Sequence, residues 1–380
     1  IRDRCYNTQQ FRRLARRRLP GPIFHYIDGA ADDEVTYRRN TEAYEECDLV
    51  PSVLAGVETI DMSTEVMGKR VDLPFFLSPT ALQRLFHHNG EAAVGAAAEK
   101  FNTWFGISSL ATASIETVGA MIKSPKLFQL YYHKDKGLTN SMIERCQDAN
   151  FDALALTVDT IVGGNRERDL VTGFTSPPRL TLKSALSFAT HPRWTLNYLF
   201  RSSFELSNLK DHVDEGSNIS LSVSDYFSTM LDQSMDWKAA EDIRNKWGKQ
   251  FCLKGIMSVE DARRAVDIGA TAIMVSNHGG RQLDGALSAF EALGPIVDTV
   301  GGECEIILDG GVRRGTHVLK ALARGATACS MGRPYLWGLA GGGEAGVTRV
   351  LNLLKTELRL NLGLLGCRRP SDVSARHLAG

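Results

Sequence analysis

The stretch AIMVSNHGGRQLD, residues 272–284, indicates how this chain folds. It begins with the apolar run Ala272–Val275, which is typical of a buried strand, and then becomes polar. Strands that are apolar on both faces belong to parallel sheets that are covered on each side. His278 and Arg281 follow this strand beside two glycines, which allow a sharp turn or the close approach of a ligand. The pairing of His278 with Arg281 suits a base that takes a proton and a cation that holds a carboxylate. The simpler alternative is a surface loop that contains both residues.

The pattern of an apolar strand followed by a helical segment recurs along the chain. The predicted strands are Leu73–Ser78, Trp104–Ser108, Lys126–Tyr131, Ala153–Val158, Phe251–Gly255, Ala272–Ser276, Glu305–Leu308 and Ala328–Met331. Helical patterns occur at Gly90–Lys100, Ile115–Ile122, Lys136–Ala149, Val259–Ile268, Ala286–Thr299, Thr316–Ala323 and Gly346–Leu360. Eight strand–helix units in this order predict an α/β fold, a single (β/α)8 TIM barrel. A doubly wound open sheet is the alternative, but no GxGxxG sequence opens the first unit.

Two segments lie outside this repeat, and we assign the whole chain, 1–380, to one domain. Residues 1–72 are expected to form an N-terminal helical cap, in which Thr8–Arg18 is an amphipathic helix that Pro20 ends. Residues 160–250 separate the fourth and fifth strands by far more than an ordinary connection, so we expect a lid or docking surface and one helix there. The barrel then covers residues 73–366, and residues 367–380 form a tail.

Within this insert, residues 179–210 combine basic and aromatic side chains. Five basic residues stand there against one acidic residue, and they are interleaved with Trp194, Tyr198 and Phe200. A basic, aromatic segment of this kind favours peripheral contact with an anionic membrane surface. A flexible lid or a subunit contact is the alternative.

Composition excludes several other classes of protein. The formal net charge is +0, which argues against nucleic acid as a partner. The seven cysteines form no CxxC pair, so no metal site and no disulfide framework are predicted, and a reducing compartment is expected. No apolar run is long enough to span a membrane, and no signal-peptide pattern is visible. We therefore expect a cytoplasmic protein that contacts the inner face of the membrane peripherally.

Polar residues gather where the predicted strands end, which is where a barrel of this type places its active site. Thr80, Ser108, Gln129 and Thr157 are uncharged and suit the edges of a neutral heterocycle. His278 needs a partner to act as a base near neutral pH, and the carboxylate of Asp159 at the end of the fourth strand can supply one.

Lys254 and two glycine–arginine turns complete the set. An ammonium inside a strand needs an electron-rich partner, which a reduced flavin could provide, whereas a Schiff-base lysine is the alternative. The turns Asp309–Arg313 and Gly332–Arg333 follow the last two strands. Exposed backbone N–H groups, arginines and helix N-termini together favour a phosphate site, and ordinary turns with solvated arginines are the alternative.

These motifs resemble one family. Ser276–Asp284 is similar to the active-site segment of the FMN-dependent L-2-hydroxy-acid dehydrogenases and oxidases, which include flavocytochrome b2, glycolate oxidase, bacterial L-lactate dehydrogenase and (S)-mandelate dehydrogenase. The resemblance runs from about Phe11 to about Gly366. Further motifs match in order at Tyr26–Ala30, Phe128–Tyr131, Leu156–Asp159, Leu253–Gly255 and Asp309–Arg313.

The resemblance implies roles in catalysis and substrate binding. His278 is then the general base and Asp159 its partner. Arg281 and Arg166 hold the substrate carboxylate with Tyr26 as a further donor, and Tyr131 contacts the substrate hydroxyl or the developing oxyanion.

The resemblance also implies FMN as the cofactor. Lys254 would stabilise the reduced flavin at N1 and O2. The other implied contacts are Pro79, Thr80 and Ala81 near flavin N5, Ser108, Gln129, Thr157 and Ser276 around the isoalloxazine and ribityl, and Asp309, Gly311, Arg313, Gly332 and Arg333 at the ribityl and phosphate.

The implied reaction is oxidation of an L-2-hydroxy acid, of the L-lactate or (S)-mandelate class, to the 2-oxo acid. His278 would take a proton either from the hydroxyl, with hydride transfer, or from Cα, with a carbanion. The family also implies a homotetramer.

The sequence contains signals for two electron acceptors. The insert with His191–Trp194 resembles the dehydrogenases that pass electrons to a membrane quinone. Ala81 instead resembles flavocytochrome b2 and the oxidases, and the oxidases use oxygen and make hydrogen peroxide. Leu110 stands where glycolate oxidase has a bulky aromatic residue, which indicates a different pocket shape. We favour the dehydrogenase because the insert is the larger feature.

Two rival classes are weighed against this interpretation. A same-fold FMN enzyme without net redox, or an isomerase of a phosphate ligand, needs no carboxylate clamp such as Arg281 and Arg166 opposite a base. A membrane-associated binding protein without redox activity, using residues 179–210, leaves the polar strand ends unexplained.

Overall fold

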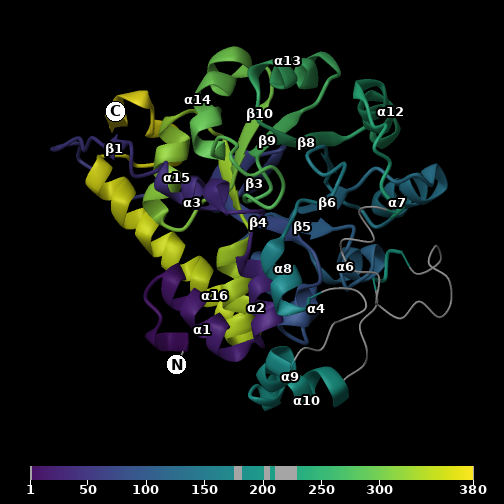
Figure 1. Ribbon diagram of the computed structural model, residues 1–380. Helices are drawn as coiled ribbons and strands as arrows, with labels where there is room; N and C mark the ends of the chain where they lie inside the picture. Colours follow the sequence, from purple (N-terminus) through teal and green to yellow (C-terminus); the bar gives the residue numbers. More distant parts are fainter. Residues whose placement is uncertain (1, 175–181, 201–205, 210–228, 380) are drawn as a thin grey trace.

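The computed structural model describes residues 2–174, 182–200, 206–209 and 229–379 (Figure 1). Eight parallel strands close into a barrel in the order β10-β11-β4-β5-β6-β7-β8-β9, which is the order of the chain. They are β4 (Phe75–Thr80), β5 (Phe105–Ser108), β6 (Lys126–Leu130), β7 (Ala153–Thr157), β8 (Gln250–Ile256), β9 (Ala272–Ser276), β10 (Glu305–Asp309) and β11 (Ala328–Met331). The predicted (β/α)8 barrel is confirmed, and each predicted strand is present.

Helices surround the barrel and connect its strands (Figure 1). They are α4 (Gln83–Phe86), α5 (Gly90–Lys100), α6 (Ile115–Met121), α7 (Lys136–Asp148), α12 (Trp237–Trp247), α13 (Val259–Asp267), α14 (Ala289–Val300), α15 (Gly315–Ala323) and α16 (Arg333–Leu365). Several begin at side-chain caps: Ser288 accepts from the backbone of Glu291, whose carboxylate accepts in return. Such a box satisfies N–H groups that a helix start leaves unpaired.

The prediction for the last helix was wrong at its start. We expected Gly346–Leu360, but α16 already begins at Arg333, directly after β11. The chain leaves helical geometry at Gly342 and Gly343, where φ is 179° and 60°, and then continues as helix. Three consecutive glycines weaken the helical pattern in the sequence, so only the part beyond this kink is recognisable.

The barrel interior explains why a site forms at one end. Successive side chains of a strand point to opposite faces, so alternate residues of each strand face inward. Toward the N-terminal ends these inward residues are apolar and buried, as Phe76, Leu127, Ala155 and Met274 illustrate. Toward the C-terminal end every strand has an inward residue that is polar and buried, and these residues are Ser78, Ser108, Gln129, Thr157, Lys254, Ser276, Asp309 and Ser330. We call them the polar layer.

Residues before β4 form helices, the second of which reaches the C-terminal ends of the barrel strands, and a hairpin that packs near their N-terminal ends. The helices here are α1 (Thr8–Arg18), α2 (Gly21–Asp28) and α3 (Val35–Glu42), and α1 has the predicted bounds. The segment also contains β1 (Asp48–Leu49), which pairs with β12 (Leu378–Ala379) of the tail, and the hairpin β2 (Thr64–Val66) and β3 (Lys69–Val71). These strands were not predicted. The hairpin packs against the barrel interior: Val66 and Met67 belong to the same buried cluster as Phe76 and Leu127, and the Trp104 indole donates to the carbonyl of Val66 over 3.1 Å.

Short helices precede α12 in the described part of the insert between β7 and β8. They are α8 (Glu167–Thr172), α9 (Leu182–Ala189) and α10 (Pro192–Phe200), and α9 and α10 project from one end of the molecule (Figure 1). The Trp194 indole donates to the carbonyl of Leu85 over 2.8 Å, which ties α10 to α4. Parts of the predicted docking segment 179–210 lie outside the described residues. Among the residues that are described, no helix is long and apolar enough to cross a bilayer.

Candidate active site

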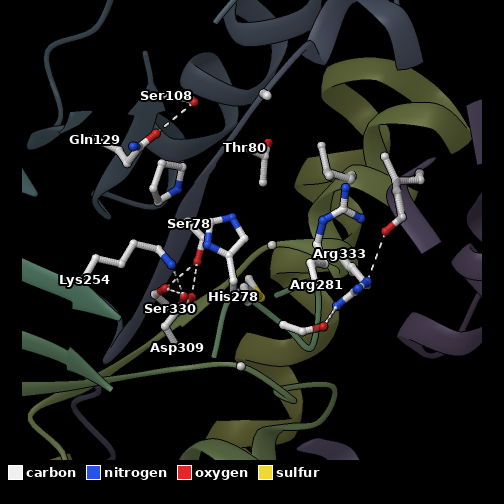
Figure 2. Close-up of a pocket in the computed structure, with 18 of the residues that line it drawn as sticks. Ser78, Thr80, Ser108, Gln129, Lys254, His278, Arg281, Asp309, Ser330 and Arg333 are labelled. Carbon is white, nitrogen blue, oxygen red and sulfur yellow. Dashed lines mark hydrogen bonds and ion pairs between the residues drawn. The ribbon is translucent and has the colours of Figure 1, made fainter. Parts of the chain in front are cut away.

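A cavity of about 1020 Å³, including its open mouth, lies at the C-terminal ends of the barrel strands. Its lining includes nearly all the residues predicted for the site: Tyr26, Pro79, Thr80, Ala81, Ser108, Gln129, Tyr131, Thr157, Arg166, Lys254, His278, Arg281, Asp309, Gly311, Arg313, Gly332 and Arg333. Asp159 and Ser276 lie behind this wall, where they contact His278 and Lys254 respectively. Figure 2 shows His278 and Arg281 on the loop after β9, opposite the Ser108–Gln129 pair.

His278 is braced from one side. Its Nδ1 lies 3.1 Å from Asp159 Oδ1 and 3.2 Å from the hydroxyl of Thr160, which itself donates to Asp159 over 2.8 Å. Nδ1–H therefore points to the carboxylate, and the other ring nitrogen, Nε2, is left as the acceptor of a proton. This is the arrangement that a general base requires.

Burial and charge act in opposite directions on this pair. Desolvation lowers the pKa of His278 below its ordinary value, although the charge and the hydrogen bond of Asp159 oppose it. Burial also opposes the charge on Asp159, but attraction to His278 and Lys254 outweighs it, so the pKa of Asp159 is lowered. At neutral pH the pair is a neutral imidazole beside a carboxylate, which is the state of a base before reaction.

Arg281 and Arg166 place two guanidinium groups on the cavity wall. Arg281 Nη1 donates to the carbonyls of Tyr26 and Gly29 over 2.6 and 3.1 Å, and its guanidinium lies 5.1 Å from the Tyr26 ring centre. Burial, and next the charge of Arg166, lower the pKa of Arg281 to about 9. Two half-buried guanidinium groups that repel each other on one wall of the cavity favour an anionic ligand there.

Lys254 has a partner that sequence reasoning did not assign to it. Its Nζ lies 2.8 Å from Asp309 Oδ2 and donates to Ser276 Oγ over 3.1 Å (Figure 2). Asp309 also accepts from Ser276 over 2.7 Å, from Ser78 over 2.5 Å and from Ser330. Although burial opposes both charges, each group favours the charge of the other, which raises the pKa of Lys254 and holds that of Asp309 well below its ordinary range.

Two polar atoms of the cavity lack partners in the described structure. Gln129 Oε1 accepts from Ser108 Oγ over 2.9 Å, whereas Gln129 Nε2 and the hydroxyl of Thr157 are buried and unpaired. Buried donors and acceptors without partners are costly, so these atoms indicate a ligand with neutral hydrogen-bonding groups.

The turns after β10 and β11 were predicted to bind phosphate. Gly311 has φ +72° and lies so near α3 that a Cβ would be 1.7 Å from the carbonyl oxygen of Asn40. Arg313 lines the cavity close to the start of α15, and its guanidinium lies 5.1 Å from the Trp337 ring centre. Arg333 also lines the cavity, but three of its nitrogens donate to backbone carbonyls of Ile27, Gly29 and Gly279. Its structural contacts thus join α16 to α2 and to the loop after β9.

Sequence reasoning missed four residues that support the site. Ser78 and Ser330 hold Asp309, Thr160 holds His278 and Asp159, and Asn40 forms a reciprocal amide pair of 2.8 Å bonds with Asn277. The two serines alternate with apolar residues of β4 and β11, and this pattern marks them only once the strands are aligned in the closed barrel. No comparable sequence signal marks Asn40, which comes from the N-terminal segment.

Comparison with known proteins agrees with this geometry. Residues 15–380 match the model of the family described as FMN-dependent dehydrogenase. An L-lactate oxidase from Nostoc sp. is 40% identical over 376 residues, 98% of this chain and 97% of its own. Glycolate oxidase from Spinacia oleracea is 36% identical over 373 residues, 98% of this chain and 95% of its own.

Solved structures give the same result. The crystal structure of the monotopic membrane protein (S)-mandelate dehydrogenase has a TM-score of 0.94 and 33% identity, with 99% of each chain covered. Mandelate oxidase has a TM-score of 0.85 and 36% identity over 99% of this chain and 98% of its own.

The cavity fits FMN by the chemistry of its donors. Gln129, Thr157 and Ser108 offer neutral hydrogen bonds, Lys254 offers a positive charge among them, and Arg313 with the N-terminus of α15 suits a phosphate. The chain therefore belongs to the FMN-dependent dehydrogenase family, and FMN is its cofactor.

Proposed function

We propose that the protein oxidises an L-2-hydroxy acid with an apolar side chain, of the lactate or mandelate class, to the 2-oxo acid. The observation that carries the proposal is the pairing of His278 with Asp159 on one side of a cavity that also exposes Arg281 and Arg166. A base and an anion-binding wall in one cavity suit a substrate with a carboxylate next to a hydroxyl-bearing carbon. The lactate and mandelate enzymes among the similar proteins support this substrate class.

Each residue then has one task. The two guanidinium groups bind the carboxylate and fix the orientation of the substrate. His278 accepts a proton at Nε2, and Asp159 stabilises the imidazolium that forms. Tyr131 and Tyr26 are buried and their pKa values are raised by burial, so both hydroxyls stay protonated and can donate hydrogen bonds. When bound, FMN accepts the two electrons that the hydroxyl-bearing carbon loses.

Apolar residues that line the cavity indicate which kind of substrate side chain it accommodates. Leu110, Phe86 and Ala81 line the same cavity, and Leu110 is buried. A methyl or phenyl group could pack against them, whereas glycolate has no side chain to do so.

Anaerobic bleaching of the flavin tests this function. L-Lactate and (S)-mandelate are added to the FMN-loaded protein without oxygen, with the D-enantiomers as matched controls. We expect the L-acids to remove the flavin absorbance near neutral pH and the D-acids to leave it. His278→Asn should slow the bleaching by roughly 10²–10⁴-fold. If no 2-hydroxy acid bleaches the flavin, the proposed oxidation is wrong and the isomerase hypothesis is favoured instead.

For the electron acceptor we propose a quinone of the membrane. The supporting observation is the pair α9–α10, where Leu186, Leu196, Tyr198 and Phe200 are 65, 53, 49 and 81% exposed. Large apolar side chains exposed together on a projecting element favour a membrane or protein contact. The similar (S)-mandelate dehydrogenase is described as a monotopic membrane protein.

Oxygen is the second candidate acceptor. It is favoured by Ala81 in the cavity and by the oxidases among the relatives. Reoxidation of the bleached enzyme separates the two. We expect a short-chain benzoquinone to restore the flavin absorbance faster than air-saturated buffer does, and rapid reoxidation by air with stoichiometric hydrogen peroxide would identify an oxidase.

A further inference from the structure

The helix α8 is tied to the N-terminal segment by polar contacts near its start. The side-chain amide of Asn165 donates to the carboxylate of Asp32 over 2.7 Å, and the N–H of Asp32 donates to the carbonyl of Asn165 over 2.9 Å. Arg168 forms ion pairs with two carboxylates, those of Asp28 and Glu34. These contacts hold the chain that follows β7 against α2, on which α8 packs (Figure 1).

Burial distinguishes the ion pairs of Arg168 from ordinary surface contacts. The side chain of Asp28 is 1% exposed and that of Glu34 is 11% exposed, whereas that of Arg168 is 34% exposed. A buried carboxylate that loses its partner is left with an uncompensated charge, so these pairs are costly to break. The stem of Arg168 also packs on Gly29, where a Cβ would lie 3.5 Å from Arg168 Cδ. Arg168 therefore has a fixed position at the end of α2.

The end of α2 also holds Arg281. Its Nη1 donates to the carbonyls of Tyr26 and Gly29. Arg166 lines the cavity together with Arg281, and it is the N-cap of α8, two residues before Arg168. Because Arg168 and Arg281 both contact the end of α2, the spacing between the two guanidinium groups of the cavity wall depends on this shared support.

We propose that Arg168 is a positioning residue for the substrate carboxylate. By anchoring α8 to the end of α2, it fixes Arg166 relative to Arg281 and raises the affinity for the anion that both contact. Arg168 itself is absent from the described residues that line the cavity, and its charge is already paired, so it acts through Arg166. The inference rests on the substrate class proposed above and adds the contact that supports one half of its binding wall.

The expected effect is large enough to measure. A hydrogen bond to a charged group changes binding by about tenfold or more. Displacing a binding group by about 1 Å can forfeit such a contact without removing the group itself. Replacement of Arg168 should therefore weaken the binding of a carboxylate about tenfold, although Arg166 and Arg281 are both still present.

Titration of the FMN-loaded protein with pyruvate tests the proposal. Pyruvate has the carboxylate but cannot reduce the flavin, so the change in flavin absorbance reports binding alone. We expect Arg168→Met, which keeps an apolar stem but no charge, to raise the Kd of pyruvate and the KM of L-lactate about tenfold. The bleaching rate at saturating L-lactate should change much less. Arg168→Lys should recover much of the affinity, because it can pair with the same carboxylates.

A double-mutant cycle shows whether Arg168 acts through Arg166. Arg166→Met alone should weaken pyruvate binding, and adding Arg168→Met to it should cause no further loss, because the group that Arg168 positions is already gone. Multiplying effects of the two changes would overturn the inference. So would a pyruvate Kd for Arg168→Met equal to that of the wild type, or a loss confined to the bleaching rate.

A matched control removes an ion pair far from the cavity. Arg263 is 39% exposed and its Nη2 lies 2.6 Å from Glu303 Oε1, beside α13 (Figure 1). Arg263→Met should leave pyruvate binding unchanged, and retained FMN reports that each variant is folded. A wild-type protein that does not bind pyruvate would overturn the inference. A protein that binds pyruvate but oxidises no 2-hydroxy acid would overturn only the proposed function.

Discussion

At the scale of single residues, His278 is held in an unusual backbone conformation. Its φ is +58°, in the left-handed region that residues other than glycine seldom adopt, and its N–H donates to Ser276 Oγ over 3.1 Å. Strain of this kind persists only where surrounding contacts fix it, and it is concentrated at functional sites. Here it directs the ring toward Asp159.

The pH dependence of substrate oxidation follows from this environment. Burial lowers the pKa of His278 below 6.5, and the base acts in its neutral form. The rate of anaerobic flavin bleaching should therefore stay constant as pH falls from 8 to 6.5 and decline only below that value. Stopped-flow absorbance at saturating substrate measures it. An acid limb centred above pH 6.5 would contradict the assignment.

The variant Asp159→Asn tests how the partner of His278 contributes to this pH dependence. Loss of the carboxylate removes the contribution that raises the pKa of His278, so the acid limb should move to still lower pH. The plateau rate should fall roughly 10²–10⁴-fold, because an amide does not stabilise the imidazolium. A variant with the wild-type plateau would show that Asp159 has no part in the reaction.

The pair of Lys254 and Asp309 yields a prediction about stability. Their side chains are 5% and 11% exposed, so removing one partner leaves a buried, uncompensated charge. We expect Asp309→Asn to lower the free energy of unfolding by roughly 3–5 kcal/mol, measured by urea denaturation at neutral pH. The double variant Lys254→Met, Asp309→Leu should recover most of this loss. If Asp309→Asn were as stable as the double variant, the ion pair of Lys254 and Asp309 would not contribute to stability in this way.

Most residues that line the cavity could be predicted because each lies in or directly after an apolar strand and carries distinctive chemistry. His278, Arg281 and Lys254 belong to this group. Ser78 and Ser330 could not be singled out, because a serine in an apolar strand gives no signal until the other seven strands are aligned beside it. The pairing of Lys254 with Asp309 joins β8 to β10, and such a contact depends on the closed barrel rather than on either strand.

At the scale of elements, the turn between β10 and α15 depends on Gly311. Its φ is +72°, and a Cβ there would lie 1.7 Å from the carbonyl oxygen of Asn40 and 2.9 Å from the ring of Tyr44. Backbone and a buried aromatic ring cannot yield as a flexible side chain would. Any larger residue must therefore push α3 away from this turn.

Gly311→Ala should consequently lower both stability and FMN affinity. The matched control is Gly285→Ala, because Gly285 has φ +78° but a Cβ there would meet no atom within 4 Å. Both variants carry the left-handed strain of about 1–2 kcal/mol, and only Gly311→Ala adds the clash. Thermal unfolding and FMN fluorescence titration measure the two effects. Equal losses in the two variants would mean that the contact with Asn40 is unimportant.

Helices were less predictable than strands, and the reasons differ between elements. α1 has strong signals, with apolar residues at Phe11, Leu14 and Ala15 and proline two residues after its end, and its bounds were predicted correctly. In α16 the glycines near the kink conceal the first half of the helix. The pair β1 and β12 joins residues 48–49 to the C-terminal tail, and two-residue strands carry no pattern of their own.

At the scale of the whole molecule, the cofactor cavity draws residues from seven strands of the barrel and from the loop after the eighth, β9. The polar layer closes the barrel interior, and Gln129 and Thr157 retain unpaired buried atoms in it. FMN should therefore act as part of the core. Binding to the folded state alone stabilises a protein by about 2.7 kcal/mol when the free ligand is a hundred times its Kd. Removing FMN should lower the unfolding temperature, and added FMN should restore it.

The same measurement separates the two ends of the cofactor. Riboflavin has the ring and ribityl of FMN but no phosphate, so the difference in stabilisation between them reports the phosphate contacts. We expect Arg313→Gln to reduce the stabilisation by FMN and leave that by riboflavin unchanged, because Arg313 lines the cavity near the N-terminus of α15. Gln129→Leu should weaken both ligands equally, since its unpaired Nε2 belongs to the neutral part of the cavity. If Gln129→Leu weakened only FMN and Arg313→Gln weakened both ligands equally, the phosphate would lie elsewhere. The cofactor would then have the opposite orientation within the barrel.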